Sequence, residues 1–107
     1  MKQGDIVLID FPFSHLRTSK LRPALVLSNS RYNRHANVLV AGIYGRSHPC
    51  SLPISSADLE LGALRKDSYI GLQNIVSVDH AIVQPRVVAT LTSRKLKSVV
   101  KELIHYL

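Results

Sequence analysis

The chain of 107 residues has a single cysteine, Cys50, no tryptophan, and only 6% aromatic residues. One cysteine excludes an intramolecular disulfide, so a hydrophobic core has to hold the fold together. Hydrophobic residues make up 46% of the chain, which is enough for such a core at this length. We therefore expect one domain that spans residues 1–107.

The N-terminus has neither a signal-peptide layout nor a long apolar run. The longest early run, Ile6 to Phe13, is interrupted by Asp10 and Pro12. It is far shorter than the roughly 20 apolar residues that a membrane-spanning helix needs. Together with the lone cysteine, this predicts a cytoplasmic protein that does not enter a membrane.

Acidic residues are absent from the whole stretch between Asp10 and Asp58. The formal net charge of the chain is +7, and this stretch holds much of the excess: Arg17, Lys20, Arg22, Arg31, Arg34 and Arg46, with His15, His35 and His48. A field of one sign attracts polyanions and speeds their association, so a nucleic acid is the favoured partner. An acidic protein partner, or a solvated arginine-rich surface, stays open.

Several catalytic motifs are also missing. The sequence has no H-E-x-x-H or C-x-x-C pattern, no glycine-rich phosphate loop, no G-x-S-x-G elbow and no closely spaced carboxylate pair. We therefore expect no metal and no cofactor. Metal-free cleavage of RNA remains possible, because RNA supplies its own nucleophile and the enzyme adds a cation, a base and an acid. Arginine suits the cation's role, since its fork holds a phosphate by two hydrogen bonds.

The apolar pattern is that of a mostly β protein. Short β-rich runs are predicted at residues 6–9, 23–28, 38–44, 52–54, 69–72, 75–78 and 87–91. Their spacing favours a compact barrel or sandwich over alternating strands and helices. A short helical turn is expected at Ser56 to Gly62, with Ser56 as its cap.

The last segment has the period of a helix instead. Apolar residues recur at helical spacing from residue 96 onward: Leu96, Val99, Val100, Leu103, Ile104 and Leu107. Thr92 is a suitable N-cap. We expect this amphipathic helix to pack against the barrel; a helix lying on a membrane surface is the alternative.

One block of sequence points to a family. Lys20 to Asn29 reads KLRPALVLSN, a charged loop running into Arg-Pro and then a strand, and Gly4 to Asp10 reads GDIVLID. Pro23 would hold Arg22 at the entrance of that strand. Together with VAGI at 40–43, DSY at 67–69, VSVD at 76–79 and the closing helix, these segments resemble the MazF/PemK family of toxin endoribonucleases of type II toxin–antitoxin systems.

The resemblance covers essentially the whole chain, and it implies both a fold and an activity. The fold would be an SH3-like barrel of the CcdB/MazF type, with five to seven strands and a C-terminal helix, assembled as a homodimer. The activity would be metal-independent, sequence-selective cleavage of single-stranded RNA, such as mRNA, that leaves a cyclic phosphate. The partner would be a cognate antitoxin with an acidic tail.

Carried over residue by residue, the resemblance makes Arg22 the catalytic arginine, which would stabilise the transition state at the phosphate. A structural Arg22 paired with Asp5 or Asp10 is the alternative. His15 lies in a loop where some members use a histidine, and it is either an acid or base or an exposed residue without a role. Tyr44 stands where the family usually has Ser or Thr, and we assign it, with His15, to proton handling.

RNA contacts are predicted for the remaining polar residues of the site. Backbone contacts are assigned to Arg17, Lys20 and Arg46, while Ser47 is a possible substitute for the missing hydroxyl. Gln73 and Asn74 are expected to read base edges. Gly71, Gln73 and Val76 stand where other members have charged residues. These departures keep a second hypothesis open, a non-catalytic protein of the same fold that binds gyrase or RNA, and a third, a small RNA-binding barrel unrelated to toxicity.

Overall fold

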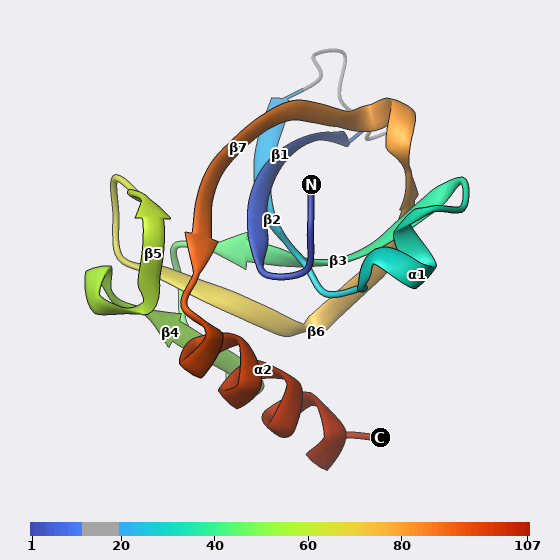
Figure 1. Cartoon of the computed structure of the whole chain (residues 1–107). Helices are drawn as coiled ribbons and strands as arrows, with labels where there is room; N and C mark the ends of the chain where they lie inside the picture. Colours follow the sequence, from blue (N-terminus) through green and yellow to red (C-terminus); the bar gives the residue numbers. More distant parts are fainter. Residues whose placement is uncertain (12–19) are drawn as a thin grey trace.

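The computed structural model describes residues 1–11 and 20–107, and its main feature is one antiparallel sheet of seven strands. The sheet curls into a partly closed barrel, and its strand order is β4-β6-β3-β2-β1-β7-β5 (Figure 1). The strands are β1 (Asp5–Phe11), β2 (Lys20–Val26), β3 (Asn37–Tyr44), β4 (Ser51–Ile54), β5 (Leu59–Gly62), β6 (Ser68–Asp79) and β7 (Val83–Leu91). The SH3-like, mostly β architecture predicted from the sequence is confirmed.

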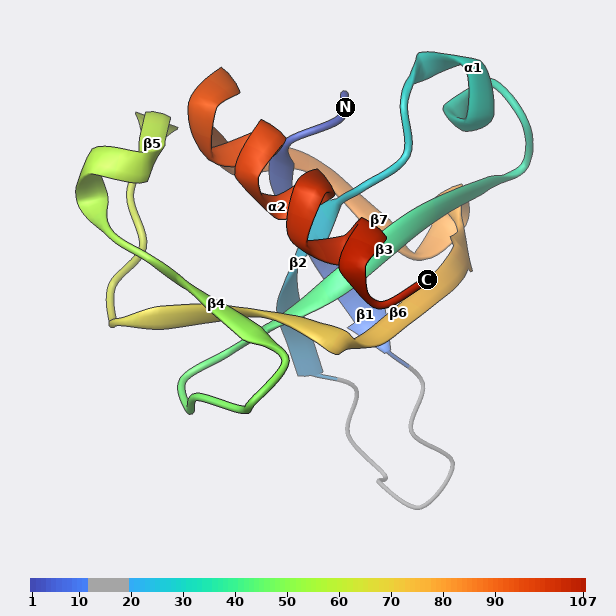
Figure 2. The same ribbon diagram turned by 90° about the horizontal axis from the view of Figure 1, so that it is seen from below.

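Helical segments connect and close the sheet. A single turn, α1 (Ser30–Asn33), joins β2 to β3, and two 3-10 turns, η1 (Ser56–Asp58) and η2 (His80–Ile82), precede β5 and β7. The chain ends in α2 (Ser93–His105), which runs along one side of the curled sheet (Figure 2). Thr92 caps α2 as predicted, since its Oγ1 accepts a hydrogen bond of 3.1 Å from the backbone N–H of Lys95.

Strand alternation sends apolar side chains to two separate cores. One core lies between the sheet and α2 and contains Ile6, Leu25, Ile70 and Val99, all with no exposed surface. The other lies on the opposite, inner face and contains Val7, Ile9, Ala24, Val26, Val38, Val40, Val78 and Val83. Because the strands of the middle of the sheet are buried on both faces, they read as continuous apolar runs in the sequence.

Two expectations about local structure are wrong. Residues 69–72 and 75–78 belong to one long strand, β6, which is interrupted by a bulge and not by a turn. The helical turn expected at Ser56 to Gly62 ends at Asp58, its N-cap is Ser55, and Leu59–Gly62 is a strand paired with β7. Leu59, Leu61 and Gly62 pair with β7, and this pairing replaces the hydrogen bonds that a local helix would have supplied.

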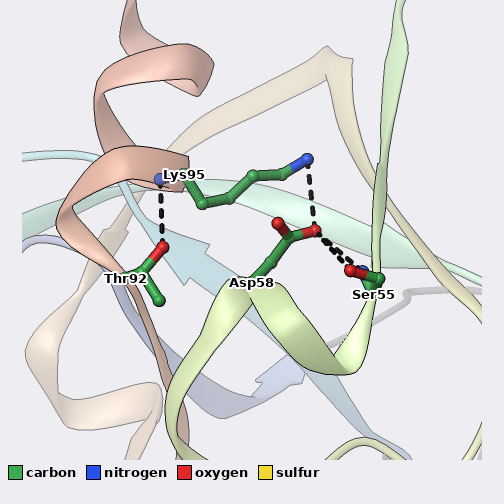
Figure 3. A network of polar contacts seen from close by, with 4 residues as sticks. All are labelled: Ser55, Asp58, Thr92 and Lys95. Carbon is green, nitrogen blue, oxygen red and sulfur yellow. Dashed lines mark hydrogen bonds and ion pairs between the residues drawn. The ribbon is translucent and has the colours of Figure 1, made fainter.

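A polar network joins the start of α2 to the connection between β4 and β5 (Figure 3). Asp58 Oδ2 accepts a hydrogen bond of 2.8 Å from the backbone N–H of Ser55 and lies 3.4 Å from Lys95 Nζ. The backbone N–H of Thr92 donates to the carbonyl oxygen of Asp58 over 2.8 Å. The hydrogen bond from Ser55, with the charge of Lys95, holds the pKa of Asp58 below its ordinary value.

Candidate active site

Arg22 lies on β2 at the point where the strand leaves its pairing with β3. Its cross-strand partner on β1 is Ile9, and the ladder with β3 begins two residues later, at Ala24. Ala24 pairs with Gly42, and because side chains two residues apart share a face, Arg22 and Tyr44 lie on the same face of the sheet, each two residues beyond this last pair. Arg22 is half-buried and is the third residue of β2, so the expectation that the strand starts at Pro23 with Arg22 at its entrance is wrong: pairing of Lys20 and Leu21 with β1 extends the strand to an earlier start.

Neither acidic residue considered as a structural partner of Arg22 is placed for that role by the strand register. Asp5 is buried, and its Oδ1 and Oδ2 accept hydrogen bonds from Thr90 Oγ1 and the backbone N–H of Lys2. It lies four residues from Ile9 along β1, about 13 Å from the row that contains Arg22. Asp10 pairs with Leu21, and alternation puts its side chain on the opposite face from Ile9 and Arg22.

The next row of the same face consists of small residues. Ala24 on β2, Gly42 on β3 and Gly71 on β6 pair in sequence across the sheet. The ring of Tyr44 lies over the two glycines: a Cβ at Gly42 would be 2.5 Å from Tyr44 Oη, and a Cβ at Gly71 would be 2.6 Å from Tyr44 Cε2. Real Cβ atoms do not approach other atoms so closely, so this position of the ring requires glycine at both sites.

A bulge in β6 brings two further polar side chains to this face. Ala41 pairs with Ile75 while its neighbour Gly42 pairs with Gly71, so Leu72, Gln73 and Asn74 are extra residues on β6. Asn74 Nδ2 donates a hydrogen bond to Tyr44 Oη. Gln73 Nε2 would lie 3.2 Å from a Cβ at Gly71, and thus also borders the ring of Tyr44.

The structure therefore brings together three of the predicted site residues, Tyr44, Gln73 and Asn74, and places Arg22 on the same face of the sheet. Lys20 is exposed two residues before Arg22, and Arg46 and Ser47 are exposed just beyond the end of β3. His15 and Arg17 lie outside the described residues. The face has a cation, a phenol and two amides, a set that can hold a phosphate and contact an unpaired base.

Sequence reasoning missed the part that glycine plays at this face. Gly71 was read only as the loss of a charged residue, yet together with Gly42 it makes the space that Tyr44 occupies. The available signal was a pair of glycines within apolar strand segments, which is typical of a close approach. In the described part of the chain, no three His, Cys, Asp or Glu side chains gather as a metal site would require.

Comparison with known proteins identifies the family. Residues 2–107 match the model of the PemK-like, MazF-like toxin of type II toxin-antitoxin systems. Because the match spans nearly the full chain, this chain belongs to that family.

A search of curated proteins gave no sequence match. Within residues 1–11 and 20–107, no helix has the length and apolar character that crossing a membrane requires.

Solved structures share the fold at low sequence identity. An endoribonuclease in complex with its cognate antitoxin from Mycobacterial species is 18% identical, with a TM-score of 0.76 over 98% of this chain and 92% of that chain. MazF in a MazE-MazF crystal structure from Deinococcus radiodurans is 20% identical, with a TM-score of 0.75 over 99% and 93%. The Mycobacterium tuberculosis toxin MazF-mt6 is 18% identical, with a TM-score of 0.74 over 94% and 93%.

Proposed function

We propose that this chain is the toxin of a type II toxin–antitoxin pair and cleaves single-stranded RNA at selected sequences without a metal ion. The observation that carries the proposal is the position of Arg22, half-buried within β2 and on the face of the sheet that strand alternation also gives to Tyr44. A guanidinium held in this way is pre-oriented for a phosphate, and it remains charged at any physiological pH. Membership in a family of toxins supports the same conclusion.

The chemistry follows from the substrate. The 2′-hydroxyl oxygen forms a bond to the adjacent phosphorus as its proton passes to a base. The bond from phosphorus to the 5′-oxygen then breaks, and that oxygen takes a proton from an acid. The products are a 2′,3′-cyclic phosphate and a 5′-hydroxyl end. Arg22 stabilises the charge that develops on the phosphate, and His15 and Tyr44 handle the protons.

The basic residues around the site supply the affinity for RNA. Lys20 and Arg46 flank the face at the ends of β2 and β3, and both are exposed. Together with Arg17 they would track the RNA backbone. The net charge of +7 and the acid-free stretch of sequence support a polyanionic substrate.

The same charge supports an acidic antitoxin as the protein partner, and a homodimer as the working form. Related structures are described as a toxin with its cognate antitoxin and as MazE-MazF. At the end of α2, Ile104 is 60% exposed and Leu107 is 92% exposed. These apolar side chains suit burial against a second copy, and light scattering of the purified protein measures whether two copies associate.

The proposal is tested by incubating purified protein with a long single-stranded RNA in EDTA. The wild type should give discrete fragments, and Arg22→Ala should give none and should also lose the power to arrest growth. Arg94→Ala is the matched control, because it removes one exposed arginine from α2 and leaves the site intact. Intact RNA with the wild type would favour the non-catalytic binding protein, and unchanged cleavage by a folded Arg22→Ala protein would contradict the mechanism.

A further inference from the structure

We propose that Asn74 is a positioning residue that fixes Tyr44 as a hydrogen-bond donor toward the phosphate of the bound RNA. The proposal deepens the function proposed above and depends on it. It gives Asn74, which the sequence assigned to reading bases, a different task, and it explains how a tyrosine works where the family usually has a smaller hydroxyl. Three observations carry it: the ring lies against the backbone of two strands, its oxygen is already an acceptor, and the donor comes from the bulge in β6.

The first observation concerns the ring. Tyr44 folds back over Gly42, two residues before it on β3, and over Gly71 on the neighbouring strand. The backbone of both strands lies directly under the ring and prevents the phenol from tilting toward the sheet. A long side chain that is immobilised before the substrate arrives loses less entropy on binding than a free one. Tyr44 is longer than a serine or threonine, and the backbone under its ring helps to hold its hydroxyl in one position.

The second observation concerns the hydroxyl. A phenolic oxygen both donates and accepts, and its O–H bond has two favourable orientations in the plane of the ring. Asn74 Nδ2 donates to Tyr44 Oη and so occupies one of these directions. The hydroxyl hydrogen is directed to the other side, away from Asn74. Tyr44 is thus held as a donor, the role that a phosphate oxygen requires.

The third observation concerns the origin of Asn74. The residue is exposed and belongs to the three residues, Leu72, Gln73 and Asn74, that stand between two paired stretches of β6. If the pairing of Gly42 with Gly71 continued without the bulge, residue 74 would lie opposite Leu39, whose side chain is on the other face. Bulges of this kind commonly re-aim a side chain beside an active site. The bulge in β6 therefore supplies the donor that orients Tyr44 on the neighbouring strand.

The proposal is tested by RNA cleavage kinetics with four variants. Asn74→Ala should lower kcat about tenfold with little change in KM, since one hydrogen bond to the phenol is lost. Tyr44→Phe should lower kcat by about tenfold to a hundredfold, because a hydrogen bond to a charged group is lost. The double variant should be no slower than Tyr44→Phe, because Asn74 acts through the hydroxyl. Asn74→Asp should not restore kcat, because a carboxylate accepts from the hydroxyl and turns its hydrogen away from the RNA.

Asn37→Ala is the matched control. Asn37 Nδ2 donates to Ser77 Oγ over 3.1 Å across the same two strands, seven residues from Tyr44 and about 23 Å along β3. Its loss should leave kcat unchanged. The ¹³Cζ resonance of Tyr44, measured without RNA, should move in Asn74→Ala and stay in place in Asn37→Ala.

The outcomes separate this inference from the function that it rests on. If the wild type leaves RNA intact, both fall. If the wild type cleaves RNA, but Asn74→Ala lowers kcat by the same factor in the wild type and in Tyr44→Phe, the positioning role is wrong. If Asn74→Ala instead changes the sequence that is cut and raises KM, Asn74 reads a base, and the positioning role is again overturned.

Discussion

The ring of Tyr44 lies so close to the backbone of Gly71 that a Cβ there would come within 2.6 Å of Tyr44 Cε2. The two residues lie on the same face of adjacent strands, two pairs apart in the register of β3 and β6. Each depends on the other: the glycine makes room for the ring, and the ring covers a stretch of backbone that has no side chain of its own. The composition of the candidate site is thus set by packing as well as by chemistry.

Substitution of Gly71 tests this dependence. Gly71→Ala should lower the free energy of unfolding by about 1–3 kcal/mol, because the new methyl group displaces the ring of Tyr44. The loss should shrink when Tyr44 is also replaced by alanine. Gly45→Ala is the control, since a Cβ at Gly45 meets nothing within 4 Å. Urea denaturation of the wild type, Gly71→Ala, Tyr44→Ala, the double variant and Gly45→Ala measures the effect, and equal losses with and without Tyr44 would mean that the contact with the ring is not what the methyl group disturbs.

The cap of α2 gives a second prediction. Thr92→Ala should lower the free energy of unfolding by about 1 kcal/mol, because the backbone N–H of Lys95 loses the acceptor that it has at 3.1 Å. Thr92→Ser retains the hydroxyl and should remain close to the wild type. A loss of similar size in both variants would show that the methyl group, and not the cap, stabilises the helix.

The carboxylate of Asp58 predicts a dependence of stability on pH. Its pKa is lowered first by the backbone N–H of Ser55 and then by Lys95, so the ionised form stabilises the fold. That contribution is present above the ordinary pKa of 3.8 and is lost as the pH falls through the lower folded value. Asp58→Asn should therefore be less stable than the wild type near neutral pH.

The difference between Asp58→Asn and the wild type should narrow as the pH falls below 3.8 and through the lower folded pKa of Asp58, because protonation then makes both side chains neutral. Chemical denaturation between about pH 2 and pH 7 measures the difference, which should be on the order of 1 kcal/mol at the upper end. A difference that stays constant over this range would mean that the charge of Asp58 is not what stabilises the connection shown in Figure 3.

Salt dependence tests the assignment of Arg46 to the RNA backbone. Each phosphate contact on a single strand contributes about −0.7 to the slope of log affinity against log salt concentration. Arg46→Ala should make the slope less steep by about that amount for every RNA sequence, and Arg94→Ala on α2 should leave it unchanged. Equal changes of the slope in the two variants would mean that Arg46 affects RNA affinity only through the net charge of the protein.

The sequence predicted the elements whose signals are local. Thr92 and the helical recurrence of apolar residues predicted α2, whereas the Arg-Pro block predicted the existence of β2 but placed its start three residues too late, at Pro23 and not at Lys20. The bulge in β6 could not be predicted from the sequence. It is a property of the pairing between β3 and β6, and the apolar residues of one strand do not show how many residues are left unpaired. The contact between Tyr44 and Asn74 depends on that bulge, so the sequence assigned both residues to the site but missed their relationship.

Strand β5 was misassigned for a different reason. Residues 56–62 begin with a plausible cap and contain Glu60 and Gly62, which disfavour strand structure. Pairing with β7 outweighs that local preference. The four residues of β5 do not by themselves show that a strand about 30 residues later in the chain will pair with them.

Arg22 as the group that acts on the RNA phosphate is the claim from which the rest follows, and one measurement tests it most directly. Purified wild-type and Arg22→Ala proteins are each incubated with total single-stranded RNA in EDTA, and the 5′-hydroxyl ends that form are mapped by sequencing. The account predicts ends that cluster at a short common sequence with the wild type, and a reduction of about a hundredfold or more with Arg22→Ala. The same ends at the same frequency from both folded proteins would contradict it.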